Sequence, residues 1–129
     1  MCLLDTVEFW DIGRIVCRTA QHRAATNPLR RNGRLSSVNG VEFAAQAMAV
    51  HGRLLAPDGV APSVGLLVSL RDYVLHCLWI DDLHSLLEIE AKRTMGNENV
   101  SIYDFTLRAD DSLLVEGRAS VLLQREAAS

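Results

Sequence analysis

One segment, residues 41–55, limits the folds that this chain can adopt. It has good helix formers, small side chains in its middle and no proline, so it predicts an α-helix. Before Arg53, its only polar side chains are those of Glu42, Gln46 and His51. A helix that is apolar on nearly every side is buried. We therefore expect this helix to be buried and not to lie on the surface.

The other segments with regular patterns predict strands, because they carry runs of β-branched, aromatic and leucine residues. They are residues 2–10, 14–19, 65–77, 86–94, 100–108 and 113–123. Segments 2–10 and 14–19 predict a hairpin, with Ile15 and Cys17 on one face. The order of two strands, one buried helix and three or four strands predicts an α+β fold, with the helix on one face of a mainly antiparallel sheet. We expect an edge of this sheet to pair with another subunit.

Composition excludes several classes of protein. With 129 residues, 49% hydrophobic and 22% charged, the chain predicts a single globular domain, 1–129. The net charge of −3 argues against nucleic-acid binding, and no apolar run is long enough to cross a membrane. The three cysteines have no CxxC spacing, which favours reduced thiols and a cytoplasmic protein.

Glu42 is the first candidate for chemistry. A carboxylate in the first helical turn is favoured by the helix dipole, and this structural interpretation is the commoner one. At the mouth of an apolar helix, however, a partly buried carboxyl holds its proton more tightly and can serve as a general acid. Gln46 lies four residues further on, hence on the same helix face. It can orient the carboxyl group, or it can make a capping or cross-subunit contact without a chemical role.

A second titratable group is needed for proton transfer, and His22 is the best candidate. The alternative is that His22 is a solvent-exposed loop residue without a chemical role. His51 is interpreted as a buried histidine with its hydrogen bonds satisfied. No cluster of histidine, cysteine or carboxylate residues has ligand spacing, so the sequence predicts no metal site. Trp10 and Trp79 are expected to be core or interface anchors.

The loop 22–37 is polar and contains Arg23, Arg30, Arg31 and Arg34. These arginines form either a solvated basic segment or a docking patch for an acidic partner or a phosphate-bearing arm. Composition alone favours the solvated segment.

The helix motif Glu42-Phe43-Ala44-Ala45-Gln46 resembles the central helix of hotdog-fold dehydratases that act on 3-hydroxyacyl thioesters of acyl carrier protein. The segments 1–19 and 22–30 and the helix together look most like the hotdog proteins of aryl polyene and xanthomonadin-type pigment clusters. An HxxGNP pattern of the family is similar to the stretch from His22 to Asn27-Pro28, which is one residue longer here. The stretch from His22 to Glu42 is also longer, and the glycine that opens the family's helix falls on Ser37 or is replaced by Gly40.

The resemblance implies a hotdog fold, in which an antiparallel sheet wraps one long helix, and dehydration to a trans-2-enoyl thioester. His22 would act as the base and Glu42 as the acid, meeting from different subunits. Amides near Gly40 and Val41 would stabilise the developing enolate at the helix start. Further expected contacts follow from the same resemblance. The residues expected to contact the substrate are Gln46, Gly40, Val41, Asn27 and Pro28. The residues expected to contact the carrier protein are Arg30, Arg31 and Arg34.

No cofactor is implied. The expected partners are an acyl carrier protein-linked substrate and a second subunit, in a homodimer or higher oligomer or a heterodimer with a homologous hotdog chain. Two other functions stay open. A hotdog thioesterase would use the helix carboxylate to activate water, and a non-catalytic hotdog subunit would pair with an active homologue.

Overall fold

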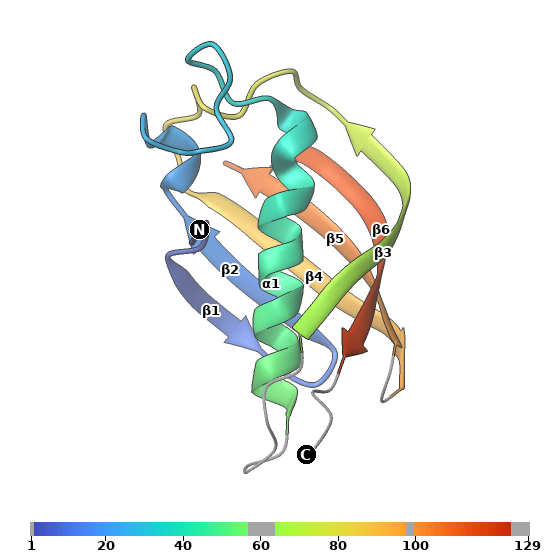
Figure 1. Ribbon diagram of the computed structural model, residues 1–129. Helices are drawn as coiled ribbons and strands as arrows, with labels where there is room; N and C mark the ends of the chain where they lie inside the picture. Colours follow the sequence, from blue (N-terminus) through green and yellow to red (C-terminus); the bar gives the residue numbers. More distant parts are fainter. Residues whose placement is uncertain (1, 57–63, 98–99, 125–129) are drawn as a thin grey trace.

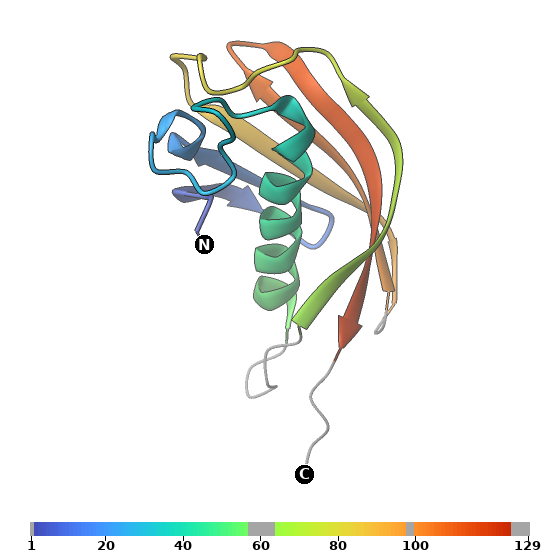
Figure 2. The same cartoon turned by 45° about the horizontal axis from the view of Figure 1, so that its top comes forward.

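The computed structural model describes residues 2–56, 64–97 and 100–124. The elements follow the order β1 (Thr6–Trp10), β2 (Arg14–Thr19), η1 (Gln21–Arg23), η2 (Ser37–Asn39), α1 (Gly40–Leu55), β3 (Val64–Leu75), β4 (Leu87–Gly96), β5 (Val100–Ala109) and β6 (Ser112–Gln124). The strands form one six-stranded antiparallel sheet in the order β1-β2-β4-β5-β6-β3. Helix α1 lies along one face of this sheet (Figure 1), and the turned view shows the sheet curving around it (Figure 2).

One side of α1 is buried against the sheet. Its buried residues recur every three or four positions: Gly40, Phe43, Ala44, Ala47, Met48 and His51. On the other side, Glu42 and Arg53 are exposed and Ala49 is partly exposed. The expected buried helix on an antiparallel sheet is therefore confirmed, while the side of α1 that carries Glu42 and Arg53 stays uncovered within one chain.

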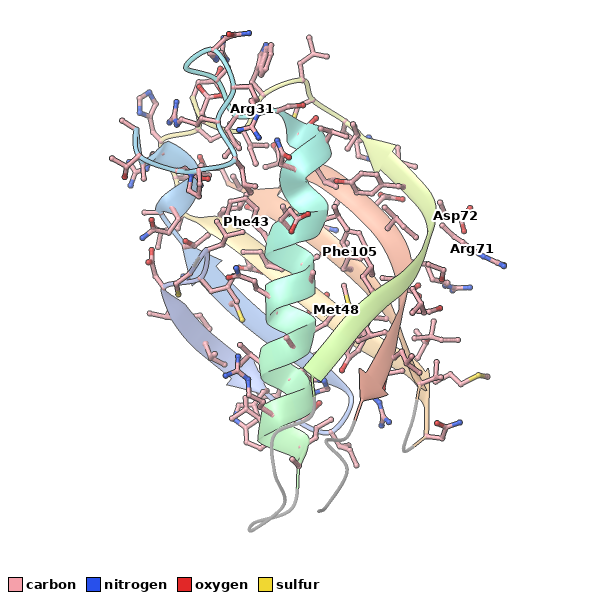
Figure 3. All side chains as sticks on the ribbon, in the orientation of Figure 1. Arg31, Phe43, Met48, Arg71, Asp72 and Phe105 are labelled. Carbon is pink, nitrogen blue, oxygen red and sulfur yellow. The ribbon has the colours of Figure 1, made fainter. Side chains whose placement is uncertain are left out.

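The concave face of the sheet forms the core with α1. In β5, buried and partly buried side chains alternate, which puts Tyr103, Phe105 and Leu107 on the helix side. Phe105 of β5 and the helix residues Phe43 and Met48, labelled in Figure 3, are all buried in this core. Full burial of such a side chain contributes about 1.5–3 kcal/mol to stability. The core therefore fixes how α1 is seated on the sheet.

The predicted hairpin is present, but its first strand is shorter than expected. Strand β1 begins at Thr6 and pairs with β2, where Ile15 and Cys17 are both fully buried. Before it, the Leu3 backbone N–H donates to Gln46 Oε1 at 2.7 Å. Residues 2–5 are therefore outside the strand, and Leu3 is held against α1.

Among the described residues, no helix is long and apolar enough to span a membrane.

Two loops meet at the N-terminal end of α1 (Figure 1). The Ser37 N–H donates to Leu78 O at 2.9 Å, and the Ile80 N–H donates to Leu35 O at 3.1 Å. The Ser36 hydroxyl accepts from the Val38 N–H and caps η2. These bonds tie the segment before α1 to the segment after β3. The candidate site residues before and at the start of the helix lie at this end.

Candidate active site

Glu42 lies in the first turn of α1 and is exposed. The sequence led us to expect a partly buried carboxyl group, and within one chain this expectation is wrong. The reason is its position on the helix, outside the buried positions that face the sheet. The helix dipole still favours a negative charge at this place. The carboxyl group is open to a ligand or to a second subunit.

His22 is fully buried in η1, so the alternative of a solvent-exposed histidine is wrong. Its Nε2 lies 3.1 Å from the carbonyl oxygen of Leu83, while Nδ1 is buried and makes no hydrogen bond. Because a carbonyl only accepts, we assign the proton to Nε2 and the free lone pair to Nδ1.

Burial lowers the pKa of His22, and the positive charge of Arg23 acts in the same direction. The carbonyl groups of Leu83, Ser85 and Thr19 oppose this effect without overcoming it. The imidazole is therefore neutral near neutral pH, as a general base must be. Within the described residues, no hydrogen bond or ion pair joins His22 to Glu42. A single chain does not connect the two groups.

The amides at the helix start are already engaged. The Gly40 N–H donates to Ser37 O. The Val41 N–H donates to the hydroxyl oxygen of Tyr73 at 3.0 Å. The same hydroxyl donates to Val38 O at 2.8 Å. Neither amide that the resemblance implies for the enolate is therefore free in this chain.

Tyr73 was not among the residues singled out from the sequence. It lies in β3, and the bond to Val41 joins residues 32 positions apart. Burial raises the pKa of Tyr73, the Val41 hydrogen bond lowers it, and the negative charge of Glu42 raises it. The hydroxyl is thus protonated at neutral pH and lies within electrostatic reach of Glu42. Nothing local in the sequence signals this contact.

The other expected substrate residues make contacts within the chain. Gln46 accepts the Leu3 N–H, which agrees with a contact that has no chemical role. The Asn27 side chain donates to Gln21 O at 2.8 Å and accepts from the Leu29 N–H at 2.9 Å. It shapes the loop, while Pro28 is exposed. Roles of Gln46, Asn27 and Pro28 in substrate binding stay predictions.

The loop arginines differ in their contacts. Arg30 Nε donates to Ala24 O at 2.8 Å, so Arg30 helps to shape its own loop. Arg34 Nε donates to Asp81 at 3.0 Å, and its guanidinium stacks 4.5 Å from the ring centre of Trp79. Arg31 is exposed and makes no ion pair within the described residues. Its Nη1 donates to Pro28 O at 3.1 Å and to Arg30 O at 2.9 Å. Docking roles for the three arginines stay predictions.

Three further expectations concern His51 and the tryptophans. His51 is fully buried, and its two ring nitrogens lie 2.7 Å from Tyr103 Oη and 2.7 Å from Asp11 O. The interpretation as a satisfied buried histidine is confirmed. Trp10 and Trp79 are 44% and 39% exposed, so neither is a core anchor of this chain. Among the residues that the structure describes, no group of three potential ligands for a metal ion occurs.

A curved antiparallel sheet around one helix, with a carboxylate in the first helical turn, defines a hotdog-fold protein. The chain belongs to the ApeP-like family, described as ApeP dehydratase, whose profile matches residues 1–129. This confirms the resemblance inferred from the helix motif. No curated protein sequence matches the chain.

Solved structures are similar in fold. One is the ApeI:P dehydratase heterocomplex from Xenorhabdus doucetiae, with a TM-score of 0.82 and 20% identity over 97% of this chain and 84% of that chain. A mutant thioesterase from Staphylococcus aureus has a TM-score of 0.69 and 12% identity, covering 92% of each chain. A hypothetical thioesterase from Streptococcus pneumoniae, solved with coenzyme A, has a TM-score of 0.67 and 10% identity, covering 94% of this chain and 86% of that chain.

Proposed function

We propose that this chain takes part in dehydrating a 3-hydroxyacyl thioester to a trans-2-enoyl thioester, in a site completed by a second hotdog subunit. The observation that carries the proposal is the exposure of Glu42 at the start of α1, in a chain of a dehydratase family. A carboxyl group that is open in one chain becomes enclosed when a partner covers this side of the helix. Enclosure favours its protonated form, which the reaction needs.

The proposed chemistry is a β-elimination. A neutral imidazole removes the proton from the carbon next to the thioester carbonyl, and the electrons move onto the carbonyl oxygen. The bond from the third carbon to its hydroxyl group then breaks, and protonated Glu42 gives its proton to the departing oxygen. Water and the enoyl thioester are the products. His22 suits the base because it is neutral and its Nδ1 lone pair is free.

His22 must become accessible to act in this way. Its side chain is fully buried in a single chain, with Nε2 near Leu83 O. A shift of η1 or of residues 83–85, driven by the partner or the substrate, is needed to open Nδ1.

The substrate is proposed to be attached to acyl carrier protein, which is acidic. The proposed docking side chain is Arg31, which is exposed and forms no ion pair within the described residues. The three cysteines Cys2, Cys17 and Cys77 are free thiols. They suit the reducing cytoplasm in which we propose that the protein works.

The test is mass spectrometry of a short 3-hydroxyacyl thioester of acyl carrier protein after incubation with the purified protein. We expect loss of one water with the wild type and a rate lower by a factor of about 100 or more in Glu42→Gln and in His22→Ala. Glu8→Gln and His76→Ala change exposed residues elsewhere and serve as controls. A free acid as product would instead identify a thioesterase.

A second candidate function is a non-catalytic hotdog subunit that pairs with an active homologue. The full burial of His22 favours it. The solved structure named above is described as a dehydratase heterocomplex, which supports pairing with a second, different chain. An unchanged substrate would contradict the proposal that this chain alone is an active dehydratase and would favour this second function.

A further inference from the structure

A bulge in the edge strand β3 turns Tyr73 toward the helix. Arg71 pairs with Arg118 and Val74 with Glu116, so two residues of β3 oppose the single residue Gly117. Side chains alternate between the faces of a strand. Without the extra residue, Tyr73 would fall on the same face as Arg71. Arg71 and Asp72 are directed away from the molecule (Figure 3).

The bulge contains backbone strain. Asp72 has a φ of +52°, in the left-handed region of backbone conformation that residues other than glycine rarely adopt. Such a conformation is strained and persists only where the surrounding structure holds it. Bulges next to active sites re-aim a side chain. The side chain re-aimed here is Tyr73.

The opposite strand makes room for the ring. A Cβ atom added at Gly117 would lie 2.8 Å from Phe105 Cζ and 3.2 Å from Tyr73 Cδ1. The two rings lie 6.1 Å apart between their centres. The missing side chain at Gly117 thus lets Tyr73 pack beneath the start of α1, next to Phe105.

We infer that the hydroxyl group of Tyr73, and not a backbone amide, donates the hydrogen bond to the thioester oxygen. The inference rests on the proposed dehydration and adds a catalytic residue to it. Both amides at the helix start are occupied, and Tyr73 Oη covers the Val41 N–H. The group that a substrate oxygen meets at this point is therefore the hydroxyl.

The hydroxyl is prepared for this role. It accepts from the Val41 N–H, which polarises its own O–H bond and makes it a stronger donor. Its proton is now directed to Val38 O, a weak competitor for an oxygen that gains negative charge. The carbonyl carbon and the third carbon of the substrate are separated by one atom, so the donor must lie near the acid. Tyr73 is bonded to Val41, the residue before Glu42.

No proton leaves Tyr73 in the reaction. The base takes the proton from the second carbon, and the hydroxyl bond to the enolate oxygen strengthens as the charge develops. The enolate then returns its electrons as the third carbon loses its hydroxyl group, which departs as water with the proton from Glu42. Tyr73 then donates to Val38 O again.

The test compares Tyr73→Phe with Tyr103→Phe, a control that also removes a buried hydroxyl hydrogen bond, to His51. We expect kcat to fall by a factor of about 100 or more in Tyr73→Phe, with a smaller change in KM. Tyr103→Phe is expected to retain the wild-type rate. Equal rates in the two variants would overturn the inference while leaving the dehydration intact.

A second measurement does not need turnover. A 3-hydroxybutyryl pantetheine thioester with ¹³C at the thioester carbon is bound to Glu42→Gln, and its carbonyl resonance is recorded. We expect a downfield shift that is lost when Tyr73→Phe is added and kept when Tyr103→Phe is added. If the wild-type protein shows no dehydratase activity and the shift still depends on Tyr73, the proposed function is rejected, but the role of Tyr73 as hydrogen-bond donor is supported. A carbonyl resonance that does not depend on Tyr73, or no shift at all, would overturn the inference.

Discussion

At the residue scale, Asp81 holds the loop before α1 to the segment after β3. Its carboxylate accepts from the Leu35 N–H at 2.9 Å and from Arg34 at 3.0 Å. Burial alone would raise the pKa of Asp81, but these two donors outweigh it and lower the pKa. The contribution of this carboxylate to stability is therefore complete above pH 3.8, its unperturbed pKa, and is lost as the pH falls below that value.

We expect Asp81→Asn to lower the free energy of unfolding by about 1.5–3 kcal/mol near neutral pH, because it weakens charge-assisted hydrogen bonds. Urea denaturation measures the change. Asp82→Asn is the control, since the Asp82 side chain is 64% exposed and lies 3.7 Å from Arg34. An exposed pair of this kind contributes about 1 kcal/mol or less. Equal losses in both variants would contradict the role of Asp81.

His22 also makes stability fall as the pH falls, but in a higher pH range than Asp81. Its pKa in the folded protein lies below the unperturbed value of 6.5. Between these two values the unfolded chain binds more protons, so stability falls as the pH falls below 6.5. We expect a slope of up to about 1.4 kcal/mol per pH unit in the wild type. In His22→Gln, where an amide can still donate to Leu83 O, this part of the slope should be absent from denaturation curves at pH 5–7. His84→Gln, a change at an exposed histidine, should keep it.

Arg31 allows a test of carrier-protein docking. If its exposed guanidinium meets an acidic carrier, Arg31→Glu should raise KM several-fold for the carrier-protein thioester and leave KM for a pantetheine thioester unchanged. Steady-state kinetics at low and high salt check this, because salt screens such contacts. Arg108→Glu reverses another exposed arginine, on β5. An equal rise in both variants would reject a local docking role.

At the scale of elements, the pairing of β3 with β6 depends on Gly117. We expect Gly117→Ala to lower the free energy of unfolding by about 1–3 kcal/mol, because the added methyl group forces the Phe105 and Tyr73 rings apart. The thermal midpoint checks this. Gly13→Ala is the control, since its new Cβ would meet its nearest neighbour at an ordinary 3.6 Å. A stable Gly117→Ala protein would show that the rings can move.

The elements themselves could be predicted because their periodicity is local. The helix 41–55 and the strand 100–108 agree with α1 and β5 to within a residue at each end. The bulge at Asp72 could not be predicted, because no glycine marks the positive φ. The Tyr73–Val41 bond depends on this bulge and on contacts far apart in the sequence. The motif of Glu42 predicts a candidate site, while the burial and the partners of Glu42 depend on tertiary and quaternary structure.

At the scale of the whole molecule, β3 is an edge strand with apolar side chains exposed on both faces. They include Leu67, Val68, Leu70, Val74 and Leu75, each 36–55% exposed. An uncovered apolar edge of this kind favours pairing with another chain. This agrees with the expectation that an edge of the sheet meets a second subunit.

We therefore expect Val68→Lys to convert a wild-type dimer into monomers, because a charge on the edge opposes strand pairing. Sedimentation velocity measures the mass in solution. Ile12→Lys is the control, since Ile12 is 75% exposed at the β1–β2 turn and lies outside β3. Dimers that survive Val68→Lys would place the interface elsewhere.

The strand order also sets the sequence of events during synthesis on the ribosome. Strand β3 pairs within the sheet only with β6, the last strand in sequence. Strand β3 leaves the ribosome before β4, β5 and its sheet neighbour β6 have been synthesised. Its apolar side chains, and the Tyr73 contact with the helix start, must wait until β6 has been made. Nascent chains that stall before β6 should therefore expose the apolar side chains of β3 and bind chaperones, whereas completed chains should not.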